Sequence, residues 1–169
     1  WDIYLCDIDG KVGSYLLNLA LIQVAPLSDR NCILWLDVKL NHPNEDGMPS
    51  QDEYDRLIEI EDSIIPQIEK DLKAIYVACL THDGSRELYF YLNENHFSQS
   101  NIQKIVQHIP DYHFDFGSKL DPEWNSYRQS FYPNAYAMQN IQNNRVICNL
   151  EKYGDILTVK RPVEHWCYF

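Results

Sequence analysis

The sequence predicts an α+β domain, a largely antiparallel sheet with helices packed on one face. Three observations lead to this prediction. Short apolar segments with the residue types of strands come in groups, separated by turn residues. Two longer segments repeat their apolar residues at helical spacing, and a further strand-like segment follows each of them. Strands interrupted by helices at two points are typical of an α+β sheet whose helices share one face.

The N-terminal part of the chain is expected to form three strands. They cover residues 2–8, 14–24 and 32–40, which are rich in β-branched, aromatic and leucine residues. Asp9-Gly10 and the segment 26–31 supply the turns between them. Because the links are short, the three strands are expected to pair as an antiparallel meander.

The longest helix is predicted from Asp52 to Leu72. Its apolar residues form one stripe at helical spacing, made of Tyr54, Leu57, Ile58, Ile64, Ile65, Ile68 and Leu72. Ser50 or Asp52 can cap the first turn of this helix. Pro66 lies inside the pattern and predicts a kink or a break there.

A hairpin and a second helix–strand unit follow the long helix. The predicted elements are strands 74–80 and 87–92, a helix over 99–109 and a strand over 112–116. The apolar faces of the two helices are expected to meet the sheet. The main core is therefore expected to contain Leu57, Ile58, Ile64, Ile65, Ile102, Ile105 and Phe114.

The remaining residues predict two more helices and a strand. Asp121 is expected to cap a third helix, with Pro122 at its first position. A fourth helix is predicted over 136–153, stopped by Gly154, and a last strand over 163–169. The chain begins with Trp1 and not with methionine, so we expect it to be a piece of a longer protein.

Composition narrows the class of partner. The chain of 169 residues has 25 acidic and 14 basic residues and a net charge of −11. This charge disfavours direct binding to nucleic acid and favours a basic protein partner. No apolar run reaches the roughly 18 residues that span a bilayer, so no membrane association is predicted. The oligomeric state stays open.

The cysteines indicate a compartment. There are five of them, Cys6, Cys32, Cys79, Cys148 and Cys167. They form no CxxC pair, and each lies in an apolar stretch. This pattern favours buried free thiols in a reducing compartment, the cytoplasm, over a disulfide framework.

No motif predicts a catalytic residue, a cofactor or a metal ion. The sequence contains no phosphate-binding glycine loop and no signature of hydrolases or zinc proteases. His82-Asp83-Gly84 is typical of a hairpin turn. His165 and Cys167 share one strand face, but zinc needs three or four ligands.

Glu61 is the most anomalous residue of the long helix. It lies three or four positions from Leu57, Ile58, Ile64 and Ile65, which puts its carboxylate in the middle of the apolar stripe. A buried carboxylate is costly unless it is paired or hydrogen-bonded. We interpret Glu61 as a buried structural acid that pairs with a basic or tyrosine side chain or braces the loop 42–50. The alternatives are a functional acid or base, or a residue at the rim of the stripe.

The outward face of the same helix is strongly acidic. Residues 52–71 contain eight acids and two bases, a net charge of −6. The residues predicted to bind a partner on this face are Asp52, Asp55, Glu59 and Asp62, with Glu69 further along. The alternatives are an ordinary solvated face and a docking stripe for a basic partner.

Four segments together resemble the domain-of-unknown-function 695 family. They are WDIYLCDIDG at residues 1–10, GMPSQDEYDRLIEIEDSI at 47–64, LTHDGSRELYFYL at 80–92 and DPEWNSYRQSFYP at 121–133. The resemblance covers residues 1–133 and implies one domain there. It implies no activity, because the family has none to carry over.

The tail of the chain has the sequence NRVICNLEKYGDILTVKRPVEHWCYF at residues 144–169. On this tail, residues 134–169 resemble the start of a regulator of ribonuclease E activity B (RraB)-like domain. The resemblance implies a fold related to the ferredoxin-like α+β sandwich, and a partner connected with RNA degradation, since the bacterial regulator binds and inhibits a ribonuclease. Only the first helix and first strand of such a domain are present in the chain. We therefore expect residues 134–169 to be an incomplete domain or to pack on the first one.

Two functions of different class follow from these observations. The first is an acidic, cytoplasmic protein-interaction or regulatory module with a basic or RNA-associated partner, related to ribonuclease regulation. The alternative is a hydrolase-type enzyme that uses a buried glutamate or a histidine in a cleft. The acidity and the lack of a nucleophile–base signature favour the first function.

Overall fold

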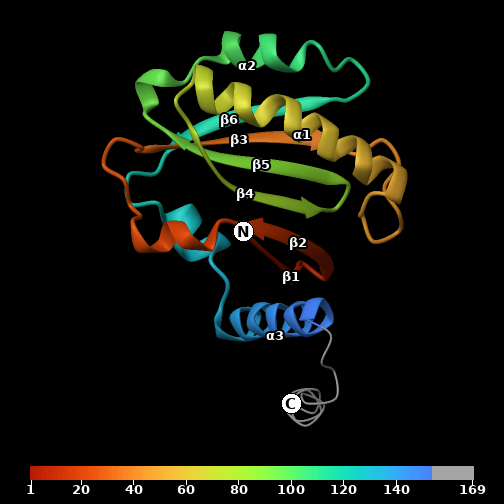
Figure 1. Cartoon of the computed structure of the whole chain (residues 1–169). Helices are drawn as coiled ribbons and strands as arrows, with labels where there is room; N and C mark the ends of the chain where they lie inside the picture. The colour runs from red at the N-terminus through yellow and green to blue at the C-terminus, as the bar shows by residue number, and fades with distance from the viewer. Residues whose placement is uncertain (154–169) are drawn as a thin grey trace. The chain divides into compact units, whose positions relative to one another are not determined.

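The computed structural model describes residues 1–153 of the chain. The chain divides into two compact units, Trp1–Tyr132 and Pro133–Phe169, and each is considered by itself. The first unit contains β1 (Asp2–Ile8), β2 (Lys11–Leu17), β3 (Cys32–Lys39), α1 (Gln51–Asp71), β4 (Ile75–His82), β5 (Ser85–Leu92), α2 (Gln99–Val106) and β6 (Phe114–Leu120). Its strands form one sheet in the order β1-β2-β4-β5-β3-β6 (Figure 1).

The predicted α+β class is confirmed. Every neighbouring pair of strands is antiparallel. The elements from β3 to β6 follow one another as βαββαβ, and their strands lie in the order β4-β5-β3-β6. This is the ferredoxin-like arrangement. The hairpin β1–β2 extends that arrangement by pairing with the free edge of β4.

The predicted meander of the first three strands is wrong. β3 does not follow β2 in the sheet; it pairs with β5 on one side and β6 on the other. Residues Cys32, Ile33 and Leu34 are all buried, as expected for a strand that is covered on both faces. The hairpin strand β1 instead exposes Ile3 and Leu5. Burial at consecutive positions therefore distinguishes β3, which pairs on both sides, from the edge strand β1.

The strand predicted over 14–24 ends early. β2 stops at Leu17, and Leu19–Gln23 form a 3₁₀ helix, η1. The Asn18 amide donates to the Val77 carbonyl at 3.0 Å, after which the chain leaves the sheet. An apolar run such as Leu19–Gln23 suits a short helix as well as a strand, so periodicity alone could not separate the two.

Helix α1 covers one face of the sheet and runs through Pro66 without a break. Ser50 is its N-cap and accepts a hydrogen bond from the Glu53 amide at 3.3 Å. The residues of α1 that are buried are Glu53, Leu57, Ile60, Glu61, Ile64 and Ile68. The predicted stripe missed Ile60, and it included Tyr54, which is 39% exposed. The buried face thus lies slightly to one side of the prediction.

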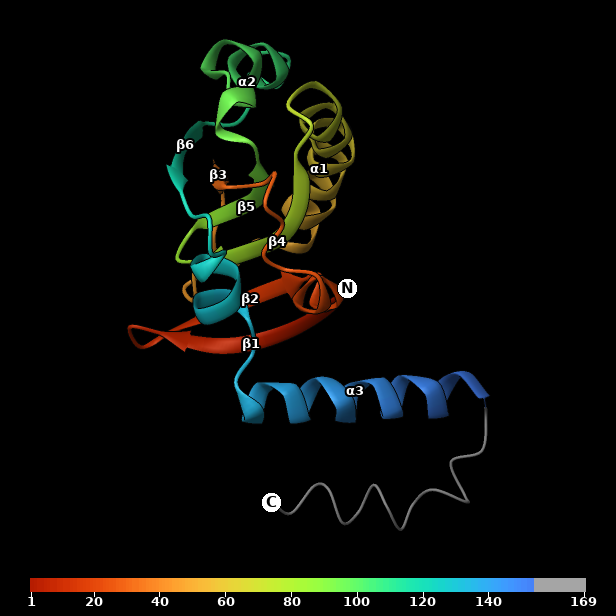
Figure 2. The same cartoon turned by 90° about the vertical axis from the view of Figure 1, so that its left-hand side faces the viewer.

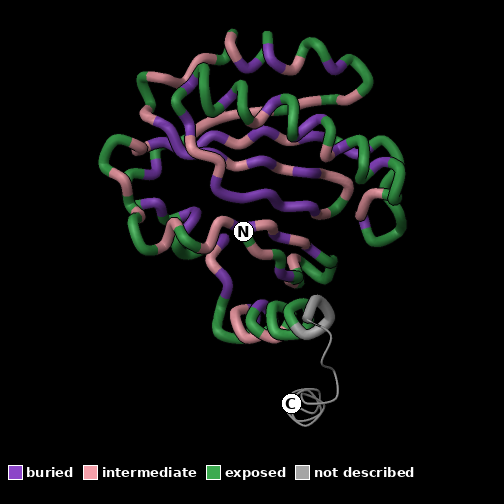
Figure 3. The backbone as a smooth tube through the Cα atoms, in the orientation of Figure 1, coloured by how far each residue is buried: buried purple, intermediate pink, exposed green. Residues whose placement is uncertain are grey.

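Helix α2 joins α1 on the same face of the sheet. Ile102 and Ile105 pack in one cluster with Ile60 and Ile64 of α1 and with the inward side chains of β3, β4 and β5. Of the other predicted core residues, Ile58, Ile65 and Phe114 are half-buried. Figure 3 shows buried residues running along β3, β4 and β5 below the two helices. The main core therefore lies between α1, α2 and the sheet.

A short π-helical turn, η3 (Ser126–Phe131), lies on the other side of the sheet from α1 (Figure 2). Asp121 caps the segment by accepting hydrogen bonds from the Asn125 and Ser126 amides, each at 2.8 Å. It also accepts one from the Tyr91 hydroxyl at 2.6 Å. Asp121 is the cap that the sequence predicts, but the helix is a single turn that starts later than Pro122.

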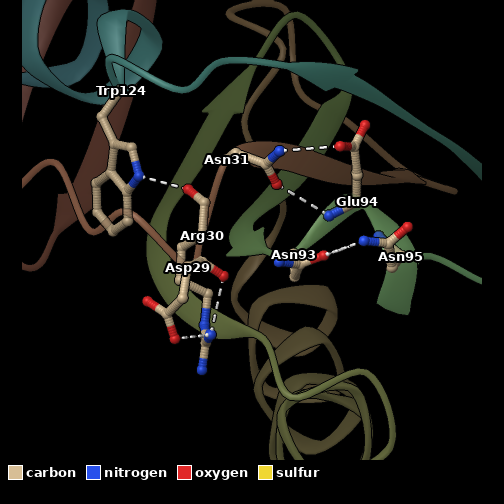
Figure 4. Close-up of polar contacts among 7 residues, drawn as sticks. All are labelled: Asp29, Arg30, Asn31, Asn93, Glu94, Asn95 and Trp124. Atoms are coloured by element: carbon tan, nitrogen blue, oxygen red, sulfur yellow. Dashed lines mark hydrogen bonds and ion pairs between the residues drawn. The ribbon is translucent and has the colours of Figure 1, made fainter.

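Trp124 anchors this segment to the sheet. It is fully buried, and its ring stacks on Tyr91 with the centroids 3.9 Å apart. Its indole Nε1 donates to the Arg30 carbonyl at 2.7 Å (Figure 4). The side chain of Asn31 next to it makes two hydrogen bonds with Glu94: Nδ2 donates to the Glu94 carboxylate at 3.1 Å, and Oδ1 accepts from the Glu94 amide at 3.0 Å. The residues just before β3, Arg30 and Asn31, are therefore fixed by hydrogen bonds to Trp124 and to Glu94.

The second unit contains α3 (Ala135–Tyr153) among the described residues. Asn134 begins it, because its side chain accepts a hydrogen bond from the Ala137 amide at 2.9 Å. The helix matches the prediction over 136–153. Gly154, the strand over 163–169, His165 and Cys167 lie outside the described residues. Within residues 1–153, no helix is long and apolar enough to cross a bilayer.

Candidate functional site

A buried ion pair joins α1 to β5. Arg86 Nε donates to Glu61 Oε1, and the two side chains are only 7% and 9% exposed. Arg86 lies opposite Thr81 of β4 in the sheet, and its Nη1 donates to the Thr81 hydroxyl at 2.8 Å. Glu61 and Arg86 are 25 residues apart in sequence, and the packing of α1 on the sheet brings them together.

The guanidinium of Arg86 stays charged in this environment. Burial works to lower the pKa of Arg86, but the hydrogen bond to the Glu61 carboxylate and the charge of that carboxylate raise it. Tyr54 adds a cation–π contact, with the ring centroid 5.5 Å from the guanidinium carbon. Burial raises the pKa of Cys79 itself to about 12, so this thiol is protonated and a poor nucleophile near neutral pH.

Two of the three guanidinium nitrogens of Arg86 have hydrogen-bond acceptors among the described residues. Nε and Nη1 have acceptors in Glu61 and Thr81, whereas Nη2 makes no hydrogen bond with any residue that the structure describes. Arg86 lines a cavity of about 320 Å³. We call this the Arg86 cavity; its polar lining residues are Ser14, Ser50, Gln51, Tyr54, Thr81 and Arg86. Met48 and Pro49 form its apolar wall.

Glu61 is the buried, paired acid that the sequence predicts, with Arg86 as its basic partner; the alternative that it braces the loop before α1 is wrong. The brace is Glu53, a buried carboxylate that accepts hydrogen bonds from the Asn41 amide at 2.5 Å and the His42 amide at 3.1 Å. Sequence reasoning missed Glu53, although one signal was present. Ser50-Gln51-Asp52-Glu53 has the spacing of a capping box, in which the glutamate turns back towards the start of the helix.

The predicted partner-binding acids all lie on the outside of α1. Asp52, Asp55, Glu59 and Asp62 are exposed. At 3.6 residues per turn they span an arc of roughly 80° on the helix. Arg56 lies beside this arc and is engaged by Glu59 at 2.7 Å. We call these four residues the acidic stripe. Glu69 is also exposed, and it accepts a hydrogen bond from the Tyr76 amide at 3.1 Å.

A second cavity, of about 370 Å³, lies on the opposite face of the sheet beside η3. Asp37 and Glu87 line it from directly opposite positions on β3 and β5. Asp37 pairs with Lys39 at 2.6 Å, and Glu87 accepts a hydrogen bond from Tyr89. Asp37 Oδ1 is buried without a partner among the described residues. The sequence did not mark these acids, because only strand pairing brings them together.

Among the residues that the structure describes, the hydrogen-bond partner of the Glu61 carboxylate is Arg86 and not a histidine. No histidine is among the described residues that line the Arg86 cavity. His82 Nδ1 lies 3.2 Å from the Val12 carbonyl, and His113 pairs with Asp115 at 3.5 Å on the surface. Across residues 1–153, no group of three histidine, cysteine or acidic side chains is arranged to hold a metal ion.

Comparison with known proteins extends only to the family. No curated protein and no solved structure matches the chain. The family model described as "Family of unknown function (DUF695)" matches residues 1–132. These residues are the first compact unit, which carries the ion pair, both cavities and the acidic stripe. The match covers more than half of the chain, and the protein therefore belongs to the family of unknown function DUF695.

Proposed function

We propose that this protein is a protein-interaction module that presents the acidic stripe of α1 to a basic protein partner. The observation that carries the proposal is the placement of Asp52, Asp55, Glu59 and Asp62 together on the exposed side of α1. The opposite side of the helix is buried against the sheet. The core therefore holds the helix rigidly, and the stripe needs no ordering before it binds.

Electrostatics supports a basic partner over an acidic one. Arg56, the base beside the acidic stripe, is already engaged by Glu59. The whole chain carries a net charge of −11, which steers positively charged surfaces towards it and repels phosphate backbones. Charges at a rim act mainly on the association rate and on specificity. Binding is therefore expected to be fast and sensitive to salt.

Two more specific parts of the proposal, ribonuclease regulation and a cytoplasmic location, rest mainly on the sequence. The resemblance of residues 134–169 to an RraB-like domain supports a partner involved in RNA degradation, and hence a role in ribonuclease regulation. Free thiols support a cytoplasmic location: Cys6, Cys32, Cys79 and Cys148 are unpaired in the described residues. The hydrolase alternative has less support, since Arg86 already holds the Glu61 carboxylate.

The proposal is tested by reversing the charge of residues in the acidic stripe. The wild-type protein captures partners from its native host, and each captured protein is then purified and its affinity is measured by titration. The variant Asp55→Lys, Glu59→Lys and Asp62→Lys should bind at least tenfold more weakly, because three attractions become repulsions. Raising the salt concentration should weaken wild-type binding as well.

A matched control variant distinguishes the effect of the acidic stripe on binding from the effect of the net charge. Asp29→Lys, Asp115→Lys and Glu123→Lys change three exposed acids away from α1 and raise the net charge of −11 by the same six units. This variant should keep most of the wild-type affinity. Equal losses in both triple variants, or no loss in the stripe variant, would refute docking through α1.

A further inference from the structure

We propose that the Arg86 cavity binds the oxyanion of a small molecule, either a carboxylate or a phosphate group. This site is independent of the acidic stripe, and the two can be tested separately. The proposal starts from Arg86, whose side chain is more than nine-tenths buried and lines the cavity. A guanidinium has five N–H donors, and the protein uses Nε and Nη1 for one acceptor each. Nη2 keeps both of its donors for a ligand.

The start of α1 adds a second attraction for a negative group. Ser50, the N-cap, and Gln51, the first helical residue, both line the cavity. The helix continues for 21 residues, so its N-terminal end carries the full positive end of the helix dipole. Helix N-termini bind phosphate and carboxylate groups for this reason. Here the helix end and the buried guanidinium border the same cavity.

The acids of α1 do not line this cavity. Gln51 and Tyr54 face it, whereas Asp52, Asp55, Glu59 and Asp62 belong to the acidic stripe. Glu61 does touch Arg86, and its charge offsets that of the guanidinium. The cavity is therefore not a general anion attractor. It favours a ligand that accepts directed hydrogen bonds from Nη2, with the guanidinium already fixed by Glu61, Thr81 and Tyr54.

The volume of the cavity suits a small molecule. Its volume of about 320 Å³ is at the lower end of the range for small-molecule sites. The hydroxyls of Ser14 and Thr81 can bind further polar groups of the ligand, and Met48 and Pro49 can cover an apolar part. The net charge of −11 disfavours a nucleic acid as the source of the phosphate.

The test is an NMR titration of the full chain with two probes, inorganic phosphate and succinate, at constant ionic strength. Sodium chloride is the reference titration. Saturable shifts of the Arg86 Nε–H signal and of the Gln51 amide, absent with chloride, are expected for at least one probe. Phosphate alone would identify a phosphate-bearing ligand, and succinate alone a carboxylate-bearing one.

Two variants locate the binding. Arg86→Lys keeps a positive charge for Glu61 and removes Nη2, so the apparent Kd should rise at least tenfold. Ser14→Leu fills the cavity from β2 without touching the ion pair, and it should have the same effect even if the lysine variant does not fold. Ser130→Leu makes the same change at the second cavity and should leave the Kd unchanged. If neither probe gives saturable shifts, or if Ser14→Leu binds as the wild type does, the proposal is overturned.

Discussion

Two acids of α1 are buried, and their carboxylates are stabilised by different kinds of partner. Glu53 and Glu61 are 6% and 7% exposed and lie eight residues apart on one helix. Glu53 is satisfied by two neutral backbone amides of a loop that precedes the helix. Glu61 is satisfied by the charged side chain of Arg86 on a distant strand. The first arrangement fixes a loop, whereas the second ties a helix to the middle of the sheet.

Because the two acids have different partners, removing the Glu53 carboxylate and removing Arg86 leave different groups unpaired. Without the Glu53 carboxylate, two amides lose an acceptor, and water can reach them because the loop residues Asn41 and His42 are exposed. Without Arg86, a full negative charge stays buried against the core. Unpaired buried charges are much more costly than unpaired neutral groups. The pair at Glu61 should therefore dominate the energetics, and the following predictions test that order.

The largest effect is expected for Arg86→Met. This change leaves Glu61 buried without its counter-charge, and the free energy of unfolding should fall by about 3–5 kcal/mol. Urea denaturation of the variant and the wild type measures the difference. The double variant Arg86→Met with Glu61→Leu replaces the pair by apolar groups and should recover most of the loss. A double variant as unstable as Arg86→Met would mean that the buried charge is not the cause.

A smaller effect is expected for Glu53→Ala. The Asn41 and His42 amides lose their acceptor, and the free energy of unfolding should fall by about 1–3 kcal/mol. Glu53→Gln keeps an acceptor oxygen and should cost less. Hydrogen exchange should show faster exchange at those two amides in the alanine variant while the β4–β5 hairpin stays protected. Uniform loss of protection would contradict a local brace.

A third buried acid, Asp121, sharpens the comparison through pH. Burial alone would raise the pKa of Asp121, but hydrogen bonds from the Tyr91 hydroxyl and from the Ser126 and Asn125 amides lower it below its usual 3.8. The ionised form therefore stabilises the fold above that value, and the contribution is lost as the pH falls through the lowered pKa. Asp121→Asn should show a shallower loss of stability on acidification, measured by denaturation between neutral and acid pH.

The smallest effect is expected in the acidic stripe. Asp62→Asn changes an exposed acid with solvent around it, and the free energy of unfolding should change by no more than about 0.5 kcal/mol. The same denaturation series as for Arg86→Met measures it. A loss comparable to that of Glu53→Ala would show that the stripe is structural, which would weaken the docking proposal.

Much of the secondary structure could be predicted, because its signals are local. Ser50 before an apolar periodic stretch marks the start of α1, and Asp83-Gly84 marks the turn between β4 and β5. Asp121 marks the cap of the segment that holds Trp124. Each signal lies within a few residues of the structure that it predicts, so the chain itself brings the partners together.

The parts of the site that were missed depend on contacts between distant residues. The apolar neighbours of Glu61 mark it as an unusual acid, but nothing near it in sequence points to Arg86. Asp37 and Glu87 meet only because β3 pairs with β5 and not with β2. Strand order is decided by the total burial of the sheet and its helices, and no short window of sequence contains that quantity.

The sequence by itself determined the α+β class, the long helix with acids on one side and the capping residues. It did so because propensity, periodicity and charge are properties of short segments and of composition. Only the tertiary structure decided that β3 lies between β5 and β6, that Glu53 holds the loop, and that Arg86 pairs with Glu61 beside a cavity. Those outcomes depend on which distant side chains are buried together, since a buried charge takes its partner from whatever the fold packs against it.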